Sequence, residues 1–149
     1  MARGDITIFD VFEYDKGIKI HDLTADDIAV AMVDSTITPT AADLTPTWSD
    51  YSPNEVSGAG YVAGGESIGN LAWATAAGKT TLSGDDVGWT INPSGPTDCR
   101  WGIIYNKDAA SDQCLGFVDL GAVVSLQADN IDIEWGVDGI HEVEANAVA

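Results

Sequence analysis

The sequence predicts a mainly β fold, an antiparallel β-sandwich or barrel-like domain with one short N-terminal helix or arm. Apolar side chains alternate with polar ones in several short stretches, and clusters of Gly, Asp and Asn separate those stretches. No segment carries the apolar stripe of a long amphipathic helix. A length of 149 residues fits a single domain, spanning 1–149, that is large enough to bury a core.

The N-terminal segment, residues 1–20, is predicted to be a short helix or an extended arm. Ile6, Phe9 and Phe12 lie at helical spacing, with Asp5 as a candidate N-cap and Gly17 as a candidate residue just beyond the helix end. The β-branched residues of this segment weaken the helix and leave the arm as the alternative.

The next two segments contrast sharply in composition. Residues 28–33 are apolar throughout and bounded by Asp27 and Asp34, which predicts a central strand covered on both faces. Residues 35–53 are rich in Thr, Pro, Ala and Ser without periodicity, which predicts a long surface loop.

The remainder of the chain predicts further short strands. The clearest shows Ile131, Ile133 and Trp135 alternating with Asp132 and Glu134. The tail, residues 144–149, is predicted to be frayed. The predicted strands cover residues 67–73, 87–91, 101–105, 115–120, 122–126, 131–135 and 140–143.

The charge excludes one class of partner. Twenty-four acidic residues against six basic ones give a net charge of −18, and such a surface repels a phosphate backbone, so nucleic acid is not predicted to bind. No apolar run is long enough for a transmembrane helix, and the first residues lack the apolar region of a signal peptide, so we expect synthesis in the cytoplasm and no membrane partner. The excess of Asp suggests a marine or halophilic setting, although small acidic domains are common generally.

The two cysteines are predicted to be free and buried. In a simple hairpin of residues 99–105 and 114–120, Cys114 lies opposite Tyr105 and Cys99 lies opposite Leu120, so the two thiols are too far apart for a disulfide. Buried cysteines behave as small apolar side chains.

A match to the G-x-S-x-G signature of hydrolases occurs at residues 65–69, centred on Ser67. The signature requires a strand, a sharp turn and a helix, but the residues after Gly69 carry no apolar helical stripe, and the only His downstream is His141. A chance match is easy among sixteen glycines, so we predict no catalytic residue and no enzymatic activity.

Two acidic segments, residues 24–27 and 83–86, contain clustered oxygen ligands that could bind a metal ion. Neither matches the EF-hand calcium loop, and His21 and His141 have no partner four residues away that could complete a zinc site. Acids in turns that cap backbone N–H groups are the favoured interpretation, with a weak Ca²⁺ site as the alternative. We therefore predict no metal and no cofactor.

The aromatic residues divide into two groups. Trp89, Trp101 and Trp135 alternate along strands and are predicted to lie in the core. An exposed surface that contacts another protein is the prediction for the second group, with a sugar-binding face as the alternative. That group contains Trp48, Tyr51, Pro53 and Tyr61.

The order of several motifs resembles a family of structural proteins in the virions of tailed bacteriophages. The resemblance spans nearly the whole chain, and it rests on "DDIAVAMVDSTITPT", "WSDYSPNEVSGAGYVAGG", "DDVGWT", "RWGIIYNK", "LGFVDLG" and "IEWGVDGI". The family pattern is kept at Asp27 to Val33, Trp48 to Asp50 and Asn54 to Gly65. It departs in the loop from Pro39 to Pro46 and in "NPSGPTDC".

The resemblance implies a non-enzymatic virion protein, most specifically a capsid decoration or cement protein. Such proteins sit on the capsid exterior, often as homotrimers, and bridge neighbouring capsomers by binding the major capsid protein. A subunit of the tail tube or of a head fibre, and a glycan-binding adhesion module, are the alternatives. The resemblance implies no catalytic residue.

Overall fold

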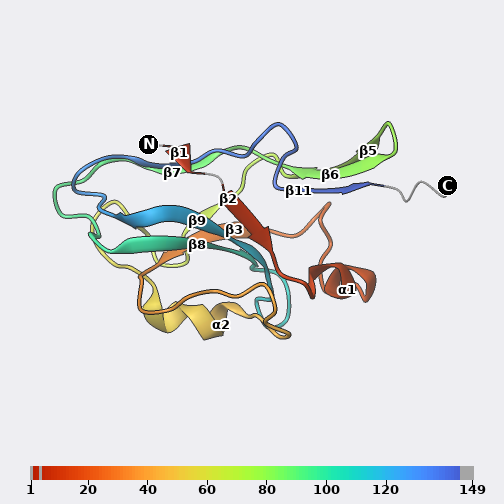
Figure 1. The fold of residues 1–149 in the computed structure, drawn as a ribbon, viewed down its shortest axis with the longest axis horizontal. Helices are drawn as coiled ribbons and strands as arrows, with labels where there is room; N and C mark the ends of the chain where they lie inside the picture. The colour runs from red at the N-terminus through yellow and green to blue at the C-terminus, as the bar shows by residue number, and fades with distance from the viewer. Residues whose placement is uncertain (1, 4, 145–149) are drawn as a thin grey trace.

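The computed structural model describes residues 2–3 and 5–144 of the chain, with side chains from residue 5 onward. It confirms the mainly β prediction: strands built almost entirely from antiparallel pairs form a sandwich-like body that is not a closed barrel. A five-stranded sheet lies in the middle, two three-stranded sheets lie on one side of it, and a long loop with helix α2 lies on the other (Figure 1).

The five-stranded sheet has the order β2-β9-β8-β3-β4. At its centre, β3 pairs antiparallel with β8, from Ile28 opposite Asn106 to Val33 opposite Trp101. All six residues of β3 are buried, which confirms the predicted strand covered on both faces. The strands of this sheet are β2 (Asp5–Ile8), β3 (Ile28–Val33), β4 (Glu66–Ser67), β8 (Cys99–Asn106) and β9 (Cys114–Val124).

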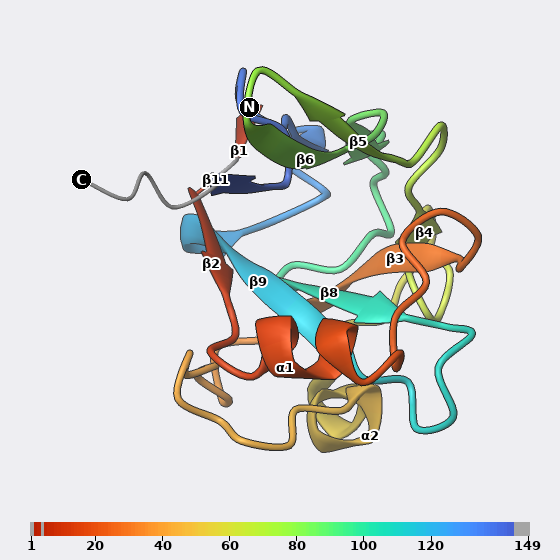
Figure 2. The ribbon, with the colours of Figure 1, turned by 90° about the vertical axis from the view of Figure 1, so that its right-hand side faces the viewer.

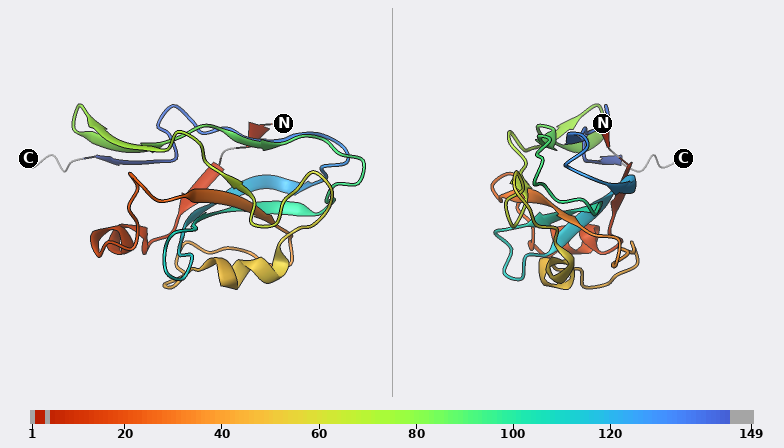
Figure 3. Two further views of the ribbon diagram at one scale, coloured as in Figure 1. Left: turned by 180° about the vertical axis from the view of Figure 1, so that it is seen from behind. Right: turned by 90° about the vertical axis from the view of Figure 1, so that its left-hand side faces the viewer.

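The two smaller sheets have the orders β1-β10-β7 and β11-β6-β5 and lie side by side over one face of the larger sheet (Figure 1; Figure 3). Most of their pairs are antiparallel, but β1 runs parallel to β10, with Ala2 opposite Asp132. Their strands are β1 (Ala2–Arg3), β5 (Ala72–Ala76), β6 (Lys79–Ser83), β7 (Val87–Trp89), β10 (Ile131–Ile133) and β11 (His141–Glu144).

Two hydrophobic clusters lie on opposite faces of the central sheet. Because side chains alternate along a strand, β3 sends Val30 and Met32 into one cluster and Ala29, Ala31 and Val33 into the other. The first cluster fills the space beneath the three-stranded sheets and includes Leu82, Trp89, Val118, Ile131 and Ile133. The second lies beneath the long loop and α2 and includes Phe9, Tyr51, Ile103, Tyr105 and Phe117.

The N-terminal segment contains the predicted short helix, but a strand comes before it. Residues 5–8 form β2, which pairs with β9, so this part is a strand of the sheet rather than an arm. Helix α1 (Phe12–Gly17) follows, with Val11 instead of Asp5 at its N-cap. The residue with left-handed backbone after α1 is Lys19, at φ 67°, and not Gly17.

The predicted surface loop, residues 35–53, is partly helical and covers the core. It contains helix α2 (Trp48–Tyr51) and continues into the 3₁₀ helix η1 (Ser52–Asn54). Pro39 and Pro46 are buried. The Pro46 carbonyl accepts the Cys114 N–H at 2.9 Å, which fastens the loop to β9. The loop therefore forms the third layer of the fold.

A hairpin of β5 and β6 was not predicted. Its two-residue turn is Ala77-Gly78, with φ of 51° and 80°, as a type I′ turn requires. The strand predicted over residues 67–73 is interrupted between Ser67, where β4 ends, and Ala72, where β5 begins. Of the predicted tail, Glu144 lies in β11, and residues 145–149 fall outside the described residues.

The two cysteines are free and buried, as predicted. Tyr105 lies opposite Cys114 in the expected register, whereas Cys99 lies opposite Val124 because the pairing shifts between Cys99 and Trp101. β9 runs unbroken from Cys114 to Val124 and joins two strands that the sequence predicted separately.

Candidate interaction surface

The predicted contact residues do not form one exposed patch. Tyr51 and Tyr61 expose only 3% and 8% of their surfaces, so the expectation of exposure is wrong for both. Trp48 is half-buried and stacks on Tyr105, with ring centroids 4.8 Å apart. Pro53 alone is exposed. Among the residues predicted for the core, Trp89 is buried, while Trp101 and Trp135 are only partly covered.

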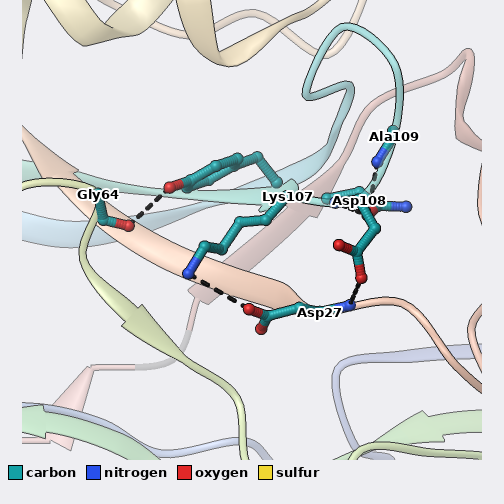
Figure 4. Close-up of polar contacts among 7 residues, drawn as sticks. Asp27, Gly64, Lys107, Asp108 and Ala109 are labelled. Carbon is teal, nitrogen blue, oxygen red and sulfur yellow. Dashed lines mark hydrogen bonds and ion pairs between the residues drawn. The ribbon is translucent and has the colours of Figure 1, made fainter.

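Buried polar contacts fasten the glycine-rich segment to the central sheet. The Tyr61 hydroxyl accepts the Met32 N–H at 2.9 Å and donates to Glu55 Oε1 at 2.8 Å. That carboxylate also accepts the Gly64 N–H at 2.6 Å, and Tyr105 donates its hydroxyl proton to the Gly64 carbonyl at 2.7 Å (Figure 4). Glu55 therefore caps a backbone N–H group, and Tyr61 is a structural residue.

The following glycine is a point of close backbone contact. At Gly65, φ is +75°, and a Cβ there would lie 1.9 Å from the Val30 carbonyl oxygen. Asp50 likewise accepts the Thr47 N–H at 3.0 Å and closes the first turn of α2. These contacts make residues 48–65 a connection that joins layers of the fold.

Ser67 and His141 occupy different sheets. Ser67 is exposed in the two-residue β4, where its neighbour across the pair is Ala29, and the chain continues into β5 without a helix. His141 lies in β11 and bonds to Glu13. The strand, turn and helix of a nucleophile elbow are therefore not present around Ser67.

The two acidic segments bind backbone and side-chain donors. Asp26 accepts the Asp22 N–H at 2.8 Å, and Asp86 accepts the Trp135 N–H at 2.9 Å. Asp27 pairs with Lys107 at 3.2 Å (Figure 4). Within residues 5–144, no group of three or more His, Cys, Asp or Glu side chains is placed to hold a metal ion.

Helix α1 is attached to the β11-β6-β5 sheet above it through one chain of contacts. His141 Nε2 donates to Glu13 at 2.7 Å, and Lys16 pairs with the same carboxylate at 2.6 Å. The Lys16 ammonium also lies 4.6 Å from the centre of the Trp73 ring on β5, a cation–π contact. Lys16 is thus held between α1 and the hairpin.

In Figure 2, α1 lies below the sheet that contains β5. A pocket of about 370 Å³ is lined by residues of α1, of the segment that follows it and of β5. Its apolar wall contains Leu23 and Trp73. Two of the six basic residues of the chain, Lys16 and Lys19, line it, together with His21, Asp22 and Thr24. Lys19 is exposed and makes no ion pair with any residue that the structure describes.

His21 lies at the buried side of this pocket, and its proton can be placed from its neighbours. The Asn106 carbonyl oxygen accepts the N–H groups of Asp108 and Ala109, at 2.9 and 3.1 Å (Figure 4). The Asn106 amide nitrogen therefore donates, at 2.6 Å to Asp26 and at 3.0 Å to His21 Nδ1. Because Nδ1 accepts, the neutral ring carries its proton on Nε2.

The His21 Nε2–H group has no hydrogen-bond partner among the described residues, although only 5% of the residue is exposed. Burial lowers the pKa of His21 to about 4, against the opposing effect of Asp26. The ring is therefore neutral at pH 7, and its Nε2 is an unsatisfied buried donor, which costs stability unless an acceptor is supplied.

β5, next to the pocket, is an open edge of its sheet. At five residues it is the longest of the six edge strands described, and its sequence AWATA has no charge and no proline. Ala76 and Lys79 flank the two-residue turn and form a hydrogen-bonded pair, and along β5 every second residue bonds to β6 in this way. The residues between them, Trp73 and Thr75, therefore point their N–H and C=O groups away from β6, toward the open edge. The opposite edge, β11, carries Glu142 and Glu144.

Two exposed apolar residues complete this end of the molecule. On α1 and just after it, Tyr14 and Ile18 are 67% and 51% exposed. We call α1, the pocket and the β5 edge together the α1–β5 surface. The sequence reasoning missed it, although one signal was present: two of only six basic residues lie three positions apart, at Lys16 and Lys19.

Comparison of the chain with protein-family models, with curated proteins and with solved structures gives no match. Within the described residues, neither helix has the length and apolar character that crossing a bilayer requires.

Proposed function

We propose that the protein is a non-enzymatic structural protein of a bacteriophage virion, a capsid decoration protein that binds the outside of the shell and bridges neighbouring copies of the major capsid protein. The resemblance of its sequence motifs to tailed-phage structural proteins gives this proposal its context. The observation that carries it is the open, uncharged edge of β5.

An unprotected edge strand is a template for adding a strand from another protein. Most edges of this fold are short or carry acids, which prevents such pairing, but β5 has neither protection. In a chain of net charge −18, an uncharged strand beside Lys16 and Lys19 is a favourable place for a partner to approach.

The three-layer packing also supports a role as a rigid subunit of an assembly. Both faces of the central sheet are buried, and the long loop is bonded to β9 rather than free. The body that presents β5 is therefore stiff, and binding at many copies on a shell turns modest individual contacts into strong attachment.

The test is binding to capsid shells assembled without this protein. We expect saturable binding and a higher temperature of shell disruption. Thr75→Pro removes one outward N–H of β5 and is tolerated at an edge, so it should weaken shell binding at least tenfold while the protein stays folded. Glu142→Pro, at the opposite edge, is the matched control and should bind as the wild type does.

Wild-type protein that neither binds the shells nor alters their heat resistance would contradict the proposed function. Equal binding by the Thr75→Pro and Glu142→Pro variants would exclude β5 as the contact. Sedimentation of the free protein tests the homotrimer that the resemblance implies, for which we expect three times the 15.6 kDa mass of the chain.

A further inference from the structure

We infer that the pocket of the α1–β5 surface receives a carboxylate side chain, Asp or Glu, from the strand that adds to β5. This inference rests on the proposed function, since it assumes a partner strand at that edge. It adds the chemistry by which the partner is selected: main-chain pairing along β5 supplies attachment, and one acidic residue fits the pocket.

The position of the pocket follows from the register of the hairpin. Trp73 has its backbone groups on the open edge of β5 and its side chain in the pocket wall. In a paired strand, the residue directly opposite another projects to the same face of the sheet. The partner residue opposite Trp73 therefore directs its side chain toward Lys16, Lys19 and His21.

The charged side chains in and near the pocket favour a ligand group with one negative charge. Lys19 has no ion-pair partner among the described residues, whereas Lys16 is already held by Glu13. A carboxylate beside Lys19 forms a charge-assisted hydrogen bond. The acids nearby, Glu13 and Asp22, disfavour a doubly charged group such as phosphate. The walls of Leu23 and Trp73 suit the apolar stem of a Glu or Asp side chain.

His21 supplies an independent indication of a ligand. Its ring lines the pocket, its Nδ1 is occupied by Asn106, and its Nε2–H lacks an acceptor among the described residues. Because Nε2 is shielded even from water, a carboxylate in the pocket reaches it only when the side chains that line the pocket move apart. A carboxylate has four lone-pair sites and can accept from Lys19 and His21 together.

The experiment uses propionate, which has the chemistry of a Glu side chain, with the neutral propionamide and inorganic phosphate as controls. NMR signals of the His21 ring report binding to the purified full-length protein at pH 7 and low salt. We expect propionate to shift these signals saturably, with a dissociation constant on the order of 10 mM for so small a ligand. Propionamide and phosphate should bind at least fivefold more weakly.

Two lysine variants locate the interaction. Lys19→Met should weaken propionate binding at least fivefold, whereas Lys79→Met, which changes a lysine at the hairpin tip outside the pocket, should leave it unchanged. Lys19→Met should also weaken binding to capsid shells. No shift with propionate, an equal shift with propionamide, or unchanged shell binding by Lys19→Met would each overturn the inference.

The two proposals fail separately. If the protein binds propionate but does not bind capsid shells, the carboxylate pocket is supported and the proposed decoration function is contradicted. Shell binding that depends on Thr75, by a protein that does not bind propionate, would retain the function and remove the pocket's role.

Discussion

Glu13 and His141 are separated by 128 positions in the chain, yet His141 Nε2 donates a hydrogen bond to Glu13 Oε1 at 2.7 Å. A carboxylate can only accept, so the direction of this bond is fixed. The contact joins α1 to β11, and Lys16 binds the other oxygen of the same carboxylate. One exposed acid therefore holds the helix beneath the β11-β6-β5 sheet.

Replacing this acid should have a small, pH-dependent effect. Partial burial raises the pKa of Glu13, but hydrogen bonds from Lys16 and His141 outweigh that effect and leave the pKa below its ordinary 4.5. The stabilisation is present above pH 4.5 and is lost as pH falls through the lower folded value. Because Glu13 is half exposed, Glu13→Gln should lower the free energy of unfolding at pH 7 by less than about 1 kcal/mol.

Urea unfolding of both proteins at pH 7 and at pH 3 measures this difference. A loss that is as large at pH 3 as at pH 7 would show that the charge of Glu13 is not its cause.

The buried His21 should make the stability of the protein depend on pH in a range above that of Glu13. Its pKa is lowered by burial from 6.5 to about 4, so between these values the unfolded chain binds a proton that the folded chain does not. Stability should therefore fall as pH decreases from 6.5 to 4, by on the order of 3 kcal/mol. His21→Gln should flatten this part of the stability curve. His141→Gln is the control and should keep it.

Two glycines with similar backbone angles should respond differently to substitution. Gly65 (φ +75°) has the Val30 carbonyl where a Cβ would go, whereas Gly78 (φ +80°) has no atom within 4 Å of that position. Gly78→Ala should cost about 1 kcal/mol through backbone strain alone, and Gly65→Ala about 3 kcal/mol or more, because β3 must also move. Chemical denaturation measures both. Equal losses would mean that the Gly65 segment is not tightly packed on β3.

Lys19 should lower the stability of the fold, because its backbone has a conformation that favours glycine. Its φ of 67° is the left-handed conformation that commonly carries Gly after a helix. Lys19→Gly should raise the free energy of unfolding by up to about 1 kcal/mol, while propionate binding is lost. Thermal melting compares it with Ala77→Gly, another non-glycine residue at positive φ, which should stabilise similarly. A Lys19→Gly protein that melts at a lower temperature would show that the side chain contributes more to folding than the strained backbone removes.

The two thiols should be inert in the native protein. Burial raises the pKa of Cys99 to about 12, and burial also raises that of Cys114 well above its ordinary value. Since the thiolate is the reactive form, a thiol reagent at pH 8 should react with neither cysteine until denaturant is added, and then with both. Rapid reaction of the native protein would show that one of them is reached by solvent.

The sequence predicted the elements whose signal is strong and local. β3 was predicted with its observed ends because six apolar residues stand between two acids, and β8 and β9 were found because their apolar residues flank a polar turn.

The remaining features depend on tertiary contacts that composition does not record. The β5-β6 hairpin is rich in Ala and Thr and turns at Ala-Gly rather than Asn-Gly, so neither its strands nor its turn gave a clear signal. Tyr51 and Tyr61 looked exposed because they lie among polar and small residues, but their hydroxyl groups find acceptors inside the fold. The pocket joins residues 16–24 with Trp73, a juxtaposition that only the folded chain creates.

The pairing of β1 with β10 and of β2 with β9 has a consequence for how the chain acquires its structure. β1 and β2 have no hydrogen-bonding neighbours in their sheets until more than a hundred further residues have been made. Contacts so distant in sequence slow the search for the native state. We therefore expect nascent chains to stay unfolded during most of synthesis, and to depend on chaperones more than a helical protein of this size would.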